Sequence, residues 1–294
     1  MPKKPAPPPT TTSKPNPKPK PKTKQSPATI PPNASPTAQT RIPWPPLTPS
    51  PKNPFYHPTK PTLHLLIPNQ AYIIPEFFPA PLCKTYTTFL ASLPLVTTPN
   101  KPKKGDAVRV NDRFQVQDDG FAAQLWEYTC LQRCVTGKTN PVEERLYSYD
   151  DDAEEEGAGQ IDREEDDLSK NGMWGGEPLG LNGNIRIYRY TKGQFFDKHY
   201  DDSNSLTFNT PEQPARPART TWTLLIYLTA CEGGETIFYP EPTRKDRNPQ
   251  PVSVKPVPGM ALLHRHGEHC MLHEGAEVRS GEKWVLRSDL VVAR

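Results

Sequence analysis

A histidine and an aspartate stand two positions apart in the stretch QFFDKHYDDS, residues 194–203, as His199 and Asp201. In an extended strand, residues i and i+2 point to the same face, so both side chains can aim at one point while Tyr200 turns away. An imidazole nitrogen and a carboxylate oxygen are both ligands for transition metals. The pair alone favours a solvated strand end, because His-x-Asp is common by chance, so the hypothesis of a metal site needs a third ligand.

A third candidate ligand, His273, lies far downstream in LHEGAEVRSGEKWVLRSDLVV. Two histidines and one carboxylate that leave three adjacent positions open are typical of the facial triad of non-haem Fe(II) sites. Three further histidines lie close by, and two of them, His264 and His266, have the i, i+2 spacing of ligands on one strand. We interpret His264, His266 and His269 as surface or core histidines, because the Gly, Gly and Lys pattern follows His273 alone.

The strands that would position these ligands are short, rich in β-branched and aromatic residues, and separated by Gly and Pro clusters. They are NIRIYRY, TTWTLLIYLT, ETIFYP, MALLHRH and KWVLRSDLVV. Upstream, LHLLIPNQAYIIPEFF predicts short strands around a Pro-Asn turn, and helical spacing predicts one helix in PLCKTYTTFLASL and a second in DDGFAAQLWEYTCLQRC. The sequence therefore predicts an α+β, mainly β fold, a jelly roll of about eight strands supported by the upstream helices.

The composition of the chain divides it into two parts. Twenty of its 39 prolines fall in residues 1–58, among Lys, Thr and Ser with almost nothing apolar to bury, which predicts a disordered arm. A single folded domain is then expected over residues 59–294, with an acidic, mobile insertion at about 143–170. The basic arm favours a solubilising tail over contact with nucleic acid.

The expected compartment follows from three further features. The N-terminus lacks the apolar h-region of a secretory signal, and no apolar run is long enough to span a bilayer. Five scattered cysteines, without a Cys-x-x-Cys pair, favour a reducing environment. We expect an intracellular protein, cytoplasmic or nuclear, without contact to a membrane.

Four motifs together resemble a known family. YRYTKGQFFDKHYDD, TLLIYLTACEGGETIFYP, PVPGMALLHRH and HEGAEVRSGEKWV are similar, in this order, to the 2-oxoglutarate and Fe(II)-dependent dioxygenases of the prolyl 4-hydroxylase-like branch. The resemblance covers about residues 184–294, and a weaker match extends to about residue 105. It implies a double-stranded β-helix core with Fe(II) held by His199, Asp201 and His273. It also implies 2-oxoglutarate and O2 as cosubstrates, with ascorbate supporting turnover.

The resemblance further implies which residues hold 2-oxoglutarate. A basic residue ten positions after the distal histidine anchors the far carboxylate of the cosubstrate, and here that residue is Lys283. Because successive residues of a strand alternate, Lys283 and Arg287 share one face, and Arg287 is the alternative anchor. Tyr190, nine residues before His199, is expected to donate to a cosubstrate carboxylate. Thr223 is expected to face the same pocket, although it and Tyr190 are equally typical of ordinary barrel-lining residues.

The resemblance implies a hydroxylase that consumes 2-oxoglutarate and O2 and yields succinate and CO2. Its substrate is left open, since a prolyl or other residue of a protein and a small molecule are both compatible with the sequence. The alternative is a noncatalytic cupin-like module that recruits partners through its charged segments, and the complete ligand set argues against it. A hydrolase that uses Zn(II) in the same triad would differ in metal content and in O2 consumption.

Overall fold

The computed structural model describes residues 42–47, 61–98, 105, 107–138, 172–210, 213–244 and 246–294. Most of the predicted arm, and all of the predicted acidic insertion at about 143–170, lie outside these residues. The chain divides into two compact units, and the second, Trp44–Arg294, contains every helix and strand described below. Among the described residues, no helix is both long and apolar enough to cross a membrane.

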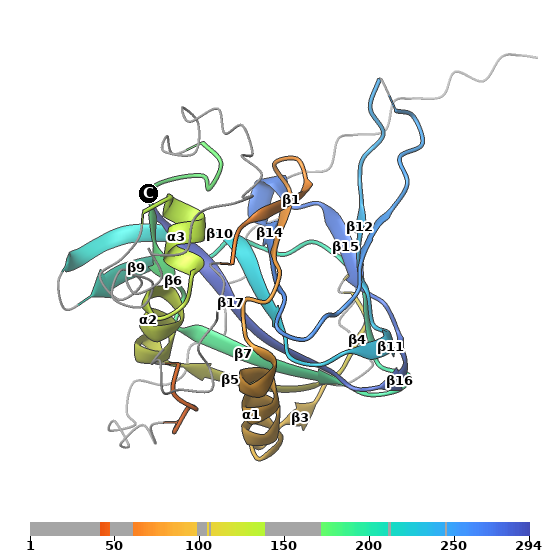
Figure 1. The fold of residues 1–294 in the computed structure, drawn as a ribbon. Helices are drawn as coiled ribbons and strands as arrows, with labels where there is room; N and C mark the ends of the chain where they lie inside the picture. The colour runs from red at the N-terminus through yellow and green to blue at the C-terminus, as the bar shows by residue number, and fades with distance from the viewer. Residues whose placement is uncertain are drawn as a thin grey trace, which may run out of the picture. The chain divides into compact units, whose positions relative to one another are not determined.

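Ten strands form one large antiparallel sheet (Figure 1). Their order is β1, β2, β14, β10, β17, β7, β5, β3, with β6 beside β17 and β9 beside β10. The two longest strands, β10 (Gln213–Tyr227) and β17 (Lys283–Ala293), pair with each other at the centre of the sheet. The other eight are β1 (His64–Ile67), β2 (Ala71–Ile74), β3 (Val96–Thr97), β5 (Asp112–Gln117), β6 (Pro178–Leu181), β7 (Asn184–Tyr190), β9 (Ser205–Thr210) and β14 (Ala261–Arg265).

A second antiparallel sheet has five strands in the order β13, β12, β15, β8, β4. Four strands of the large sheet, β7, β17, β10 and β14, and four of the small sheet, β8, β15, β12 and β13, make the two halves of a double-stranded β-helix. The predicted jelly-roll fold is therefore confirmed, and additional strands widen the large sheet. The remaining strands are β4 (Arg109–Val110), β8 (Phe195–His199), β12 (Thr236–Tyr239), β13 (Val252–Val254), β15 (Leu272–Gly275) and the small pair β11 (Cys231–Gly233) and β16 (Val278–Gly281).

Alternation along β17 decides which side chains face the interior between the two sheets. Trp284 and Leu286 are buried in the core between the large sheet and the helices. Val285 is buried on the opposite face, in a second core to which both sheets contribute. Lys283 and Arg287 share the face of Val285 and line the same pocket.

Three helices cover the outer face of the large sheet, namely α1 (Ala80–Ala91), α2 (Asp119–Glu127) and α3 (Leu131–Thr136) (Figure 1). The prediction of one helix over the second segment is wrong, because the structure divides it into α2 and α3. Thr129 lies at the break, where its hydroxyl donates to the Leu125 carbonyl at 2.6 Å and accepts from the Leu131 amide at 3.2 Å. A threonine hydroxyl that bonds the backbone competes with the helical hydrogen bonds, which favours a break here.

A short segment before the domain predicted from the sequence also packs against these helices. Trp44 stacks on Phe121 with ring centroids 4.0 Å apart, and its indole nitrogen donates to Asp118 at 2.8 Å. Leu47 is buried in the same core. The packed part of the chain therefore includes residues 44–47, which fall within the range expected to be the arm.

Candidate metal centre

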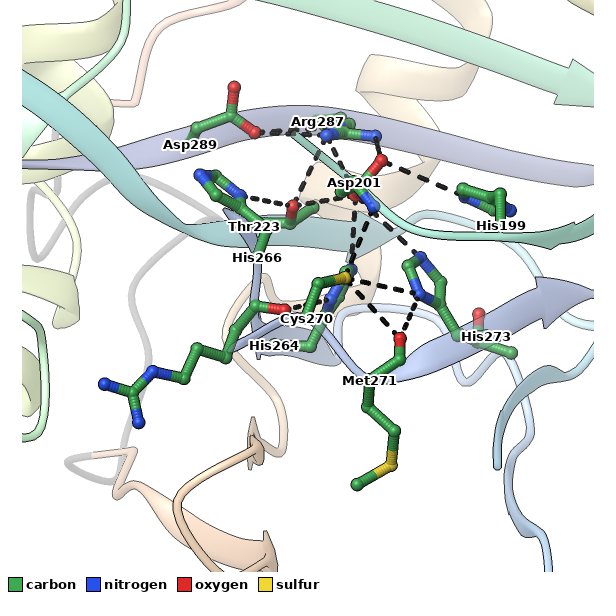
Figure 2. Close-up of polar contacts among 12 residues, drawn as sticks. His199, Asp201, Thr223, His264, His266, Cys270, Met271, His273, Arg287 and Asp289 are labelled. Carbon is green, nitrogen blue, oxygen red and sulfur yellow. Dashed lines mark hydrogen bonds and ion pairs between the residues drawn. The ribbon is translucent and has the colours of Figure 1, made fainter. Parts of the chain in front are cut away.

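The structure brings His199, Asp201 and His273 together in space. His199 ends β8, Asp201 follows it by two residues, and His273 lies opposite His199 on the neighbouring strand β15. One ligand atom from each residue lies within 4.8 Å of the other two. The Nε2 atoms of His199 and His273 lie 3.9 Å and 3.8 Å from the Asp201 carboxylate, as Figure 2 shows.

Backbone carbonyls fix the orientation of both imidazole rings. Nδ1 of His199 lies 2.7 Å from the carbonyl oxygen of Asp197, and Nδ1 of His273 lies 2.9 Å from that of Met271. A ring nitrogen that faces a carbonyl carries the proton, so the Nε2 lone pair of each ring is directed to Asp201. Histidines that bind metals in proteins are held in this way.

Burial keeps both imidazoles neutral and therefore able to bind a metal ion. It lowers the pKa of His199 to about 4, with a further contribution from the nearby His273. Burial also lowers the pKa of His273 below its ordinary value. Two neutral nitrogen donors and one carboxylate are a donor set that suits a divalent first-row metal ion.

Asp201 is ionised because the attraction of the Arg287 guanidinium outweighs the desolvation of the carboxylate. Burial alone would raise the pKa of Asp201, but Arg287 and the surrounding histidines hold this pKa well below its usual range. The Arg287 guanidinium contacts both carboxylate oxygens, with nitrogen to oxygen distances of 3.2 Å and 3.0 Å, and Thr223 donates to one of them at 3.0 Å. A carboxylate has about four lone-pair sites. These three contacts therefore leave room for a metal ion.

Arg287 contacts a second carboxylate as well as Asp201. Asp289 lies two residues further along β17, with one oxygen 3.4 Å from the guanidinium, and Arg186 binds its other oxygen at 2.8 Å. Arg287 lines the pocket, but its charge is already offset by the carboxylates of Asp201 and Asp289. It therefore suits the positioning of Asp201 better than the binding of a further anion.

Lys283 is a buried cation in the same pocket. Its side chain is 4% exposed, and among the described residues no carboxylate lies within ion-pair distance of it. Its ammonium lies 5.5 Å from the ring centroids of both Tyr190 and Tyr227. Burial lowers the pKa of Lys283 to about 8, so most of the lysine is still charged at neutral pH. An ammonium in this state is suited to bind an anionic ligand.

The pocket that contains the three candidate ligands and Lys283 has a volume of about 440 Å³, measured with its open mouth. Tyr190 lines this pocket and is buried, which raises the pKa of its phenol. Thr223 is not among the lining residues, in contrast to the expectation from the sequence. Its hydroxyl lies between Asp201 and Nδ1 of His266, 3.0 Å from each. Thr223 therefore contacts the metal ligand rather than the cosubstrate pocket.

The structure gives His264 a different place from the one that the sequence suggested. His264 is buried and lines the pocket, with its Nε2 atom 3.8 Å from the Asp201 carboxylate. His266 is also buried, between the hydroxyls of Thr220 and Thr223. His269 is exposed. The i, i+2 spacing of His264 and His266 was the signal that could have identified the first of them.

Comparison with known proteins shows what this site is similar to. Residues 185–288, which include the three candidate ligands and Lys283, match the model of the 2OG-Fe(II) oxygenase superfamily. Over 114 residues the chain is 36% identical to prolyl 4-hydroxylase 1 of Arabidopsis thaliana. That alignment covers 34% of this chain and 38% of the relative, so the chain spans well under two thirds of the relative's length.

Three prolyl hydroxylases are among the solved structures that resemble this one. The viral collagen prolyl hydroxylase of Paramecium Bursaria Chlorella virus-1 has a TM-score of 0.41 and 15% identity, over 76% of this chain and 97% of that chain. A Pseudomonas putida prolyl-4-hydroxylase has a TM-score of 0.42 and 14% identity, over 76% and 93%. A prolyl hydroxylase from Trichoplax adhaerens, in complex with a hypoxia inducible factor peptide fragment, has a TM-score of 0.43 and 15% identity, over 76% and 84%.

Proposed function

We propose that this protein is an Fe(II)- and 2-oxoglutarate-dependent hydroxylase. The observation that carries the proposal is the convergence of two neutral imidazoles, one carboxylate and one buried ammonium in a single pocket. The match of residues 185–288 to the model of the 2OG-Fe(II) oxygenase superfamily supports the same reaction class. A noncatalytic binding module would have no need for this set of residues, so it is not favoured.

Each residue of the site has a defined part in this proposal. His199, Asp201 and His273 would hold the iron on one face, and Arg287 would keep the Asp201 carboxylate ionised and oriented. Lys283 would bind the far carboxylate of 2-oxoglutarate. When bound, the iron and 2-oxoglutarate would supply the oxidation of a substrate C–H bond to C–OH by O2, with succinate and CO2 as coproducts.

The lining of the pocket would favour the binding of the cosubstrate carboxylate. Most of its wall is apolar or aromatic, with Phe196, Leu225 and Val285 among the lining residues. Such a wall excludes water, which strengthens the attraction between Lys283 and a bound carboxylate. Tyr190, buried with its ring centroid 5.5 Å from the Lys283 ammonium, would donate its phenol proton to the same carboxylate.

The class of substrate and the compartment are finer parts of the proposal. The curated relative is named a prolyl 4-hydroxylase, which supports a prolyl residue of a protein as the first substrate to test, with another residue or a small molecule as alternatives. The five cysteines are scattered along the sequence without a Cys-x-x-Cys pair, which supports a reducing, cytoplasmic or nuclear location. Contact of the basic arm with nucleic acid stays a prediction.

The test is uncoupled turnover of 2-oxoglutarate. Purified protein with Fe(II), ascorbate and 2-oxoglutarate should consume O2 and form succinate, whereas His199→Ala should not. His269→Ala is the matched control, because His269 is an exposed histidine outside the pocket and its loss should leave turnover unchanged. Equal succinate from the wild type and His199→Ala would contradict the proposal. Bound zinc with no O2 consumption would indicate a hydrolase instead.

A further inference from the structure

A third imidazole faces the candidate metal centre in addition to those of the triad. His264 lies on β14, and its side chain is 2% exposed. Its Nε2 atom lies 3.8 Å from the Asp201 carboxylate, the same distance as that of His273 and close to the 3.9 Å of His199. Three imidazole nitrogens therefore surround one carboxylate (Figure 2).

These distances are compatible with donors that share one metal ion. Nitrogen and carboxylate ligands bind a divalent first-row ion at about 2.0–2.2 Å, so two donors of one ion lie at most about 4.2 Å apart. The 3.8 Å between His264 and Asp201 is within this limit. The His264 ring is also placed against His273 much as the His199 ring is, with centroids 4.6 Å and 4.3 Å apart and interplanar angles of 59° and 53°.

The Nε2 atom of His264 is available to bind a ligand. Among the described residues Nε2 has no hydrogen-bond partner, since the Asp201 carboxylate lies 3.8 Å away, and Nδ1 lies 3.4 Å from the Arg265 carbonyl oxygen. The ring also lines the pocket, so its nitrogen is accessible to a bound ion.

The contact between Nδ1 and a backbone carbonyl, which orients the imidazole ring, is longer for His264 than for the two triad histidines. Its Nδ1 contact of 3.4 Å compares with 2.7 Å for His199 and 2.9 Å for His273. His264 also lies outside the group whose donor atoms are all within 4.8 Å of one another, so its ring must shift to join an ion bound by the other three. Both observations indicate that His264 would bind a metal ion weakly and could dissociate from it.

The number of coordination positions requires that this ligand can leave. Four protein ligands would occupy four of six positions, and a cosubstrate that chelates through two oxygens would fill the rest, so O2 could not reach the ion. We propose that His264 is a displaceable fourth ligand, which binds the metal ion in the absence of 2-oxoglutarate and is displaced when 2-oxoglutarate binds. This inference rests on the proposed function of the same site.

The experiment compares metal affinity with and without cosubstrate. Co(II) is the probe, because it does not support turnover, and the proteins are the full-length wild type, His264→Phe and the control His269→Phe. Without 2-oxoglutarate, His264→Phe should bind Co(II) about 10-fold or more weakly than the wild type and the control do. With saturating 2-oxoglutarate the three proteins should agree within about twofold. By linkage, Co(II)-loaded His264→Phe should then bind 2-oxoglutarate more tightly than the wild type, by the same factor.

The outcomes separate the two proposals. Equal Co(II) affinity of the wild type and His264→Phe without cosubstrate, or a difference that 2-oxoglutarate leaves unchanged, would overturn the role of His264 and leave the triad in place. Failure of the wild type to bind Co(II) more tightly than His199→Ala would overturn both proposals.

A second measurement needs no variant and remains informative if His264→Phe does not fold. The electron paramagnetic resonance spectrum of the Cu(II)-loaded wild type should show three coupled nitrogens without 2-oxoglutarate and two with it. Two nitrogens in both states would contradict the inference.

Discussion

The buried charge of Lys283 should lower the free energy of unfolding of the ligand-free protein. The size of this effect follows from the pKa shift that burial causes. Burial lowers the pKa of Lys283 from 10.5 to about 8. At about 1.4 kcal/mol for each pH unit between these values, the buried charge costs the folded state about 3 kcal/mol. At pH 7 the unfolding free energy of Lys283→Met should therefore exceed that of the wild type, by up to about 3 kcal/mol.

The sign of the pH dependence follows from the same shift. Below pH 8 the lysine is charged in the folded and the unfolded state, so the folded state bears the whole cost. Between pH 8 and pH 10.5 the folded protein has released a proton that the unfolded chain still holds, so the unfolding free energy of the wild type rises with pH. The advantage of Lys283→Met should therefore shrink across this window.

The assay is urea unfolding of the metal-free proteins at pH 7 and pH 10, with Lys192→Met as the control. Lys192 is exposed, so its substitution should leave the unfolding free energy nearly unchanged at both values. A Lys283→Met variant less stable than the wild type at pH 7, with the same pH dependence, would refute the reasoning.

The same lysine should help the proposed cosubstrate to bind. Loss of one partner of a buried charged pair costs about 2–5 kcal/mol. In isothermal titration of the Co(II)-loaded protein, Lys283→Met should therefore bind 2-oxoglutarate at least about 30-fold more weakly. For the wild type, affinity should fall about tenfold per pH unit above pH 8, as the free lysine loses its charge. Equal affinity for the two proteins would assign the anchor to another residue.

Three further predictions concern the centre and its support. Arg287→Met leaves the Asp201 carboxylate without its cationic partner and Asp289 with Arg186 alone, so urea unfolding should show a loss of about 3–5 kcal/mol. A loss below about 1 kcal/mol, on the order of a surface ion pair, would contradict this. Gly259→Ala should lower the unfolding free energy by more than about 1 kcal/mol, because φ is +84° and the added Cβ would lie 2.0 Å from the Phe78 carbonyl oxygen; an unchanged midpoint would show that the backbone adapts. A divalent ion at 100 times its dissociation constant should raise the unfolding free energy by about 2.7 kcal/mol in thermal melts, and a chelator should reverse the gain; a melting temperature that responds to neither would exclude a metal bound to the folded state.

The sequence carried enough information to predict the strands and the face on which their side chains lie. Alternation in KWVLRSDL is a local property, so it placed Lys283 and Arg287 on one face without knowledge of the neighbouring strands. The spacing of His199 and Asp201 is local in the same sense, whereas the place of His273 beside them came from the resemblance of ordered motifs. The jelly-roll class followed from the number and character of the strands.

The contacts that depend on strand register could not be predicted in this way. Arg287 meets Asp201, and Thr223 bonds the same carboxylate, because β10 pairs with β17 in a register that no local pattern specifies. The place of His264 depends on its pairing opposite Thr223, which the structure alone supplies. The helix break at Thr129 depends on the hydrogen bond from its hydroxyl to the Leu125 carbonyl. The spacing of hydrophobic residues gives no information about this hydrogen bond.

The number of ferrous ions that the chain retains tests the central claim most directly. After anaerobic dialysis with Fe(II) and 2-oxoglutarate, iron analysis should find one ion per chain in the wild type and almost none in His199→Ala, Asp201→Ala or His273→Ala. Retention of iron by all three variants, at the level of the wild type, would contradict the claim that these side chains form the metal centre.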